Sequence, residues 1–338
     1  MTDLRTLLAS VPSPAVERRP EIERAIASSV EYLGTDVAQR SLDADTYWPK
    51  WNSPWWHMLL LHELGEARRI PERAVSKMVE RLDALRVKIF PIQAHELPDG
   101  ADPHRDVSCH CAVGSIHQVL QACGVDVDRA VPWIPRWLTG YQMADGGLNC
   151  DSDAYLVTGE CPSSMVATVP IFEALLGRRD STPVERLAVE RAARFLIDRE
   201  LVQGSRSIHN AAERDAAPTW LEPCFPRFYF YDVLRGLAAL VRWVEVGGGS
   251  FPLQAVGKVI EHLVVAFPDG VVRPRRRAYA GQTTLMLRDG VWVREPASTF
   301  PLLEVASVVG EPNETLSRQW SVTRRALLGL IDDGRLAA

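Results

Sequence analysis

The chain has 338 residues, of which 46% are hydrophobic and 24% charged, as in an ordinary soluble globular protein. Its formal net charge of -5 gives no reason to expect a nucleic-acid partner. No apolar run reaches the roughly 18–20 residues of a membrane span, and the N-terminal sequence lacks the pattern of a signal peptide. We therefore expect a cytoplasmic protein without a membrane span, whose six cysteines are thiols or metal ligands rather than disulfides.

Apolar residues recur at helical spacing along most of the chain, and Gly or Pro marks several helix ends. This pattern predicts helices at 20–34, 55–67, 71–85, 109–124, 126–140, 163–177, 182–201, 227–244, 252–267 and 313–331. The stretch 283–295 consists instead of two alternating runs around Asp289-Gly290, which predicts a β-hairpin. We expect one domain spanning 1–338, with the hairpin inside an insertion at 265–300.

The predicted helices alternate between two kinds. The second helix of each pair is apolar on most sides, as in WWHMLLL and MVATVPIFEALL, whereas the first has a charged face. Second helices begin near residues 54, 108 and 162 at equal spacing, and again near 227 and 315, which indicates a degenerate repeat. Because all-apolar helices are buried, the sequence predicts an inner ring of second helices inside an outer ring. If the pairs are arranged alike, all inner helices start at one end.

The stretch from Tyr141 to Ser164 joins two of the predicted helices and is long and polar. Loops of this length in compact domains tend to be functional or disordered. Its acidic and thiol side chains are Asp145, Cys150, Asp151, Asp153 and Cys161. We therefore expect chemistry in this stretch.

Within this stretch, Q-M-A-D-G-G-L at 142–148 resembles the Gln-Trp-type repeat of terpenoid cyclases and protein prenyltransferases. The segments FPRFYFYDVLRGL and SRQWSVTRRALLGL also resemble those of uncharacterised bacterial and archaeal relatives of that superfamily. The resemblance covers roughly residues 20–332 and implies an all-α fold, an α/α toroid of about five helix pairs, to which 283–295 adds the hairpin. A shared fold does not carry a reaction with it.

One activity implied by the resemblance is that of a cyclase, an isomerase or lyase. Class II cyclases protonate an alkene with the central acid of an Asp-x-Asp-Asp motif, of which Asp151-Ser152-Asp153-Ala154 retains a part. Two close carboxylates can share a proton, so that one stays protonated near neutral pH. We expect Asp153 or Asp151 to be a general acid acting on a small apolar, isoprenoid-like substrate. The alternative is an ordinary turn, in which Asp is also favoured.

A second implied activity is that of a zinc-dependent transferase that activates a thiol. Prenyltransferases bind zinc through an Asp, a Cys and a His from separate inner-helix starts, and thiolates and imidazoles are good zinc ligands. The possible metal ligands are Cys109, Cys150, Asp151 and His209. With both activities in view, the candidate catalytic residues are Asp106, His110, Cys150, Asp151 and Asp153. No cofactor other than zinc is indicated.

The predicted inner-helix starts and the loops that lead to them are rich in aromatic side chains. Their rings would line an apolar cavity and stabilise a cation over their faces, although packing of loops onto the ring is the alternative. The expected substrate-binding residues are Trp55, Trp56, His57, Cys109, Cys161, Ser164, His209, Phe225, Tyr229 and Trp320. Tyr47, Trp48 and Trp51 belong to the same aromatic group.

The incomplete state of both family motifs leaves a third reading, a non-catalytic toroid that binds a ligand or a partner. The basic run Arg273-Pro274-Arg275-Arg276-Arg277 fits a diphosphate site or a solvated loop. We expect an enzyme rather than a binding protein, because an acid pair beside an aromatic cavity requires the fewest coincidences.

Overall fold

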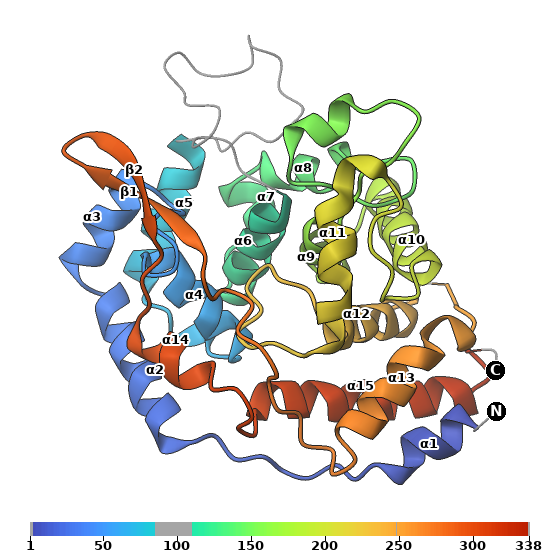
Figure 1. Cartoon of the computed structure of the whole chain (residues 1–338). Coiled ribbons are helices and arrows are strands. Elements are labelled where there is room, and N and C mark those ends of the chain that lie inside the picture. The colour runs from blue at the N-terminus through green and yellow to red at the C-terminus, as the bar shows by residue number, and fades with distance from the viewer. Residues whose placement is uncertain (1–2, 85–109, 248, 337–338) are drawn as a thin grey trace.

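The computed structural model describes residues 3–84, 110–247 and 249–336 (Figure 1). It is 57% helical, and the part it describes contains 15 α-helices and one two-stranded antiparallel hairpin. This confirms the prediction of a mostly helical protein with one hairpin.

The helices follow one another with short connections in the first half of the chain. They are α1 (Leu4–Ser10), α2 (Pro20–Leu33), α3 (Asp36–Ala44), α4 (Pro54–Glu63), α5 (Glu72–Ala84), α6 (His110–Ala122), α7 (Val127–Ala130) and α8 (Ile134–Gly140). The second half contains α9 (Met165–Leu176), α10 (Pro183–Asp198), α11 (Ala211–Ala216), α12 (Val233–Glu245), α13 (Gln254–Ala266), α14 (Pro301–Ala306) and α15 (Glu314–Asp332). The short 3₁₀ turns are η1 (Ala67–Arg69), η3 (Ser152–Leu156), η4 (Ile208–Asn210) and η5 (Ala217–Leu221).

The hairpin consists of β1 (Thr283–Arg288) and β2 (Val291–Pro296). Asp289 and Gly290 connect the strands with φ of 50° and 80°, the left-handed conformation that a two-residue hairpin turn requires. The Asp-Gly pair therefore identified both the element and its turn.

The helices expected to form the inner ring are neighbours in chain order. Helix α4 packs on α6, α6 on α9, α9 on α12, and α12 on α15. The closest approach is between α6 and α9, where a Cβ on Gly114 would lie 2.6 Å from the carbonyl carbon of Pro170. Among the amphipathic helices, α5 packs on α3, α10 on α8, and α13 on α10.

The expectation that every inner helix starts at the same end is wrong for α12. Arg235, in the first turn of α12, pairs with Glu173 in the last turn of α9 at 2.7 Å. Glu63, the last residue of α4, accepts the N–H groups of Arg227 and Phe228, shortly before α12 begins. The start of α12 therefore lies beside the ends of α4 and α9.

The first residues of the described chain pack against its last helix. Arg324 of α15 donates to the carbonyl oxygens of Leu8 and Pro12 at 2.8 and 2.9 Å. Arg5 pairs with Asp332 at 2.6 Å, and the two ends of the chain lie close together in Figure 1. The N-terminal segment thus fastens α15 in place.

Candidate functional site

The stretch 141–164 folds around Gln142 and the pair Gly146-Gly147. The Gln142 amide donates to the carbonyl oxygens of Gly146 and of Ala188 on α10, at 2.8 and 2.9 Å. Gly146 has φ of 89°, and a Cβ on Gly147 would lie 2.6 Å from the Ser163 Cβ. The Q-M-A-D-G-G-L motif therefore shapes the backbone and attaches it to α10.

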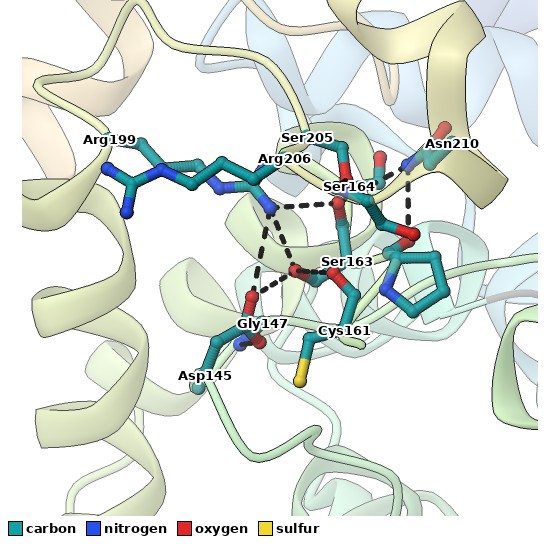
Figure 2. A network of polar contacts seen from close by, with 12 residues as sticks. Asp145, Gly147, Cys161, Ser163, Ser164, Arg199, Ser205, Arg206 and Asn210 are labelled. Atoms are coloured by element: carbon teal, nitrogen blue, oxygen red, sulfur yellow. Dashed lines mark hydrogen bonds and ion pairs between the residues drawn. The ribbon is translucent and has the colours of Figure 1, made fainter. Parts of the chain in front are cut away.

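A buried network at Ser163 joins this stretch to α10 and α11 (Figure 2). The Ser163 hydroxyl donates to the Asp145 carboxylate and accepts from Arg199 at 2.9 Å. Arg199 also pairs with Glu213 at 2.8 Å, and both side chains are at most 6% exposed. Glu213 accepts the N–H of Met165, the first residue of α9, while its burial raises its pKa. Because every charge here is paired within the protein, this network supports the fold.

The predicted acid pair lies on the surface. Asp151 and Asp153 are both exposed, at the N-cap and in the first turn of η3. The Asp151 carboxylate accepts the N–H of Asp153 at 3.1 Å, and the Asn149 amide oxygen accepts the N–H of Asp151 at 2.9 Å. These are the bonds of a turn, so the structure places the pair in a setting that the turn alternative accounts for.

His110 is the one predicted catalytic residue that the structure brings to the stretch 141–164 from outside it. It is fully buried at the start of α6, and its Nε2 lies 2.8 Å from the Tyr155 hydroxyl. Burial raises the pKa of Tyr155. The same hydroxyl contacts the backbone of Asn149, next to the half-buried Cys150. Asp106 and Cys109 lie outside the described residues.

The remaining metal and thiol candidates are spread apart. His209 is exposed on η4, Cys161 and Ser164 are half-buried, and the Ser164 N–H donates to Leu148 at 2.7 Å. Across 3–84, 110–247 and 249–336, no three His, Cys, Asp or Glu side chains are grouped so that they could hold a metal ion.

Most of the predicted aromatic residues are core packing. Trp55, Trp56 and Trp320 are at most 1% exposed, and Phe225 is equally buried. His57 stacks on Phe300 with ring centroids 3.7 Å apart, and burial lowers its pKa to about 3. Tyr229 is half-buried, and it is described below with Lys50.

The basic run is occupied by internal contacts. Arg276 donates to the carbonyl oxygens of Glu222 and Tyr231, at 3.0 and 2.7 Å. Arg277 donates to that of Ser307 at 3.0 Å, and Arg273 pairs with Asp269 at 2.9 Å. These arginines hold the segment before the hairpin against its neighbours.

A cavity of about 470 Å³ lies among the helices expected to form the inner ring, and all five contribute to its wall. The polar lining residues are His62 and Glu63 of α4, Ser115 and Gln118 of α6, Glu173 of α9, Arg235, Arg242 and Glu245 of α12, Thr315, Arg318, Gln319 and Thr323 of α15, and Arg227. The wall is therefore polar, in contrast to the apolar, aromatic cavity expected from the sequence.

Charges deep in this cavity compensate one another. Arg235 forms a two-pronged ion pair with Glu173, with bonds of 2.7 to 3.2 Å, and Arg227 pairs in the same way with the fully buried Asp232. Arg227 also donates to Gln319 at 2.6 Å. Burial raises the pKa of Glu63 despite its two backbone donors.

Several neutral polar groups of the wall are left without partners. The buried hydroxyl oxygens of Ser115 and Thr315 hydrogen-bond to nothing in the described chain. His62 has no hydrogen bond to a described residue either, and burial lowers its pKa, which keeps the imidazole neutral at pH 7. Buried polar groups are normally hydrogen-bonded, so these groups are available to a ligand.

The sequence analysis missed this cavity, and a signal for it was present. Glu63, Glu173 and Arg235 each interrupt a helix that is otherwise largely apolar. Charged side chains are rarely buried unless they are paired, so isolated charges on several inner helices predict pairing at a common centre.

The sequence matches no protein-family model, and comparison with curated proteins and with solved structures finds no match either. No described helix combines the length and the apolar character needed to cross a lipid bilayer.

Proposed function

We propose that the protein is an α/α toroid whose central cavity binds a small polar molecule. The ring arrangement is supported by the chain-order packing of α4, α6, α9, α12 and α15 and by their shared cavity. The observation that carries the binding function is the set of buried, unpartnered polar groups in that cavity, Ser115 Oγ, Thr315 Oγ1 and the His62 ring. A ligand that donates and accepts hydrogen bonds would satisfy them.

The charge pattern favours a ligand without a large net charge. Arg227 and Arg235 are neutralised by Asp232 and Glu173, and the neutral hydroxyl, amide and imidazole groups remain for recognition. Near the mouth, Arg242 and Arg318 are exposed together with Glu245, so both signs are present there as well.

The test is selective retention of a small molecule from a mixture of polar metabolites by equilibrium dialysis and mass spectrometry. Ala238 lines the cavity, so Ala238→Trp fills it, whereas Val265→Trp places the same ring on the exposed face of α13. We expect wild type and Val265→Trp to retain the same compound and folded Ala238→Trp to lose it. Equal retention by Ala238→Trp, or no retention by wild type, would refute the proposal.

Cyclase and zinc-dependent chemistry, as implied by the resemblance, stay predictions with their own tests. For the first, Asp151→Asn/Asp153→Asn must abolish turnover of a polyene substrate, although both carboxylates lie on the surface. For the second, about one zinc ion per chain must co-purify and be lost with Cys150→Ala or His209→Ala. An unaffected double variant excludes the first, and unaffected metal content excludes the second.

A further inference from the structure

Four aromatic rings surround the ammonium group of Lys50, away from the central cavity. The Lys50 Nζ lies 5.8, 5.3, 5.3 and 5.1 Å from the ring centroids of Tyr47, Trp48, Trp51 and Tyr229. It also donates a hydrogen bond to the Tyr229 hydroxyl at 3.0 Å. Each ring is within the distance at which the negative face of an aromatic ring attracts a cation.

The backbone holds these rings in place without the help of the Lys50 side chain. The Asp45 carboxylate accepts the N–H groups of Tyr47 and Trp48 at 2.7 and 2.8 Å. The Lys50 N–H donates to the Thr284 hydroxyl at the base of the hairpin, at 2.6 Å. The arrangement of the rings therefore does not depend on the ammonium group between them.

Ring packing fixes the inner side of the group further. Trp51 is 1% exposed and stacks on Phe228 with centroids 5.2 Å apart. Tyr229 lies against Trp51 at 5.8 Å. Tyr47, Trp48 and Tyr229 are only half-buried, so the outer side of the group is partly open. A rigid, partly open set of rings is preorganised for a cation.

We propose that Tyr47, Trp48, Trp51 and Tyr229 form an aromatic cage for a methylated or quaternary ammonium compound, which Lys50 occupies when no ligand is bound. Quaternary ammonium ions are recognised by such cages, whereas a primary ammonium is strongly hydrated. A second cavity, of about 450 Å³, shares Trp51 with the cage and has Gln282, Thr299 and Glu304 in its wall. It gives the remainder of such a compound a place next to the cage.

Lys50 acts in this arrangement as an internal competitor. A tethered group has a high effective concentration at its own site, so it lowers the apparent affinity for a free ligand. Removal of the ammonium group by Lys50→Ala should expose the cage. We expect the affinity for tetramethylammonium, measured by calorimetry, to rise about tenfold or more over that of wild type.

Three comparisons make this measurement specific. Lys258→Ala removes an exposed lysine that pairs with Glu200, and it should bind as wild type does. Lys50→Ala/Trp48→Ala should lose the gain, because one wall of the cage is gone. Uncharged tert-butanol, which has a similar shape, should not bind to Lys50→Ala. A Lys50→Ala variant that binds no more tightly than wild type, equal binding by the double variant, or equal binding of the alcohol would overturn the proposal.

A second measurement uses wild-type protein and does not depend on the variants folding. The lysines of the chain are Lys50, Lys77, Lys88 and Lys258, so acetylation of each can be followed by mass spectrometry. Tetramethylammonium chloride should increase the acetylation rate of Lys50 about threefold or more relative to Lys258, when compared with sodium chloride at the same ionic strength. An unchanged ratio at the highest salt concentration would contradict displacement of Lys50 from the cage.

Discussion

A single guanidinium group, that of Arg199, connects three separate parts of the chain. It contacts Ser163 before α9, Glu213 on α11 and, at 3.7 Å, Asp145 in the stretch 141–164. A buried ion pair loses little when it is complete, but removal of one partner leaves an uncompensated charge. The network is therefore a sensitive point of the fold.

Arg199→Met should lower the free energy of unfolding by about 3–5 kcal/mol, because it leaves Glu213 buried without its partner. Arg194→Met on the same helix is the matched control, since Arg194 pairs with Glu190 on the exposed face of α10. The control should unfold at nearly the wild-type denaturant concentration. If both variants unfold together, the network contributes no stability.

The buried His57 makes stability depend on pH in a defined direction. Its pKa is about 3 in the folded protein and 6.5 ordinarily, so the unfolded chain binds more protons between these values. Stability is then fully present above pH 6.5 and falls as the pH falls, on the order of 3 kcal/mol by pH 4. His57→Gln should remove this part of the slope in urea titrations from pH 7 to 4, whereas exposed His209→Gln should retain it.

At the scale of elements, the contact between α6 and α9 depends on a glycine. A methyl group on Gly114 would collide with the Pro170 carbonyl, and both belong to backbone that cannot move aside. Gly329 of α15, by contrast, faces open space. The two glycines separate packing from helix propensity, which favours alanine in both places.

Gly114→Ala should therefore destabilise the protein by about 1–3 kcal/mol, and Gly329→Ala should stabilise it by about 0.5–1 kcal/mol. Denaturant midpoints at constant slope would measure both. A stabilising Gly114→Ala would mean that α6 and α9 are further apart than the structure places them.

Local patterns predicted the elements well. The Asp289-Gly290 turn, the start of α2 at Pro20 and the apolar α9 were all readable, because each depends on neighbouring residues alone. The orientation of α12 was not readable. It depends on contacts of Glu63 and Glu173 with residues far along the chain, and such contacts leave no periodic pattern in the sequence.

At the scale of the whole molecule, the same limit applies to the candidate site. Sequence reasoning favoured Asp151 and Asp153 because they are close together in the chain, yet they form a surface turn. The cavity residues His62, Ser115 and Thr315 come from three helices and are brought together only by folding. Composition shows which side chains are reactive, whereas long-range packing decides which of them share a cavity.

Closure of the molecule depends on Arg324, which is 4% exposed on α15. Arg324→Ala should lower the free energy of unfolding by about 2 kcal/mol or more, because buried carbonyl oxygens of Leu8 and Pro12 lose their donor. The adjacent Arg325 is exposed, so Arg325→Ala should leave thermal unfolding nearly unchanged. Equal effects of the two variants would show that the N-terminal segment does not fasten α15.

The same contact bears on how the protein is made. Leu8 leaves the ribosome long before Arg324, 316 residues later in the chain. At common rates of translation, the N-terminal segment waits roughly 15 to 60 s for its partner. During that time the apolar side of α1 has no α15 to cover it, so the nascent chain offers a binding site for chaperones until synthesis is nearly complete.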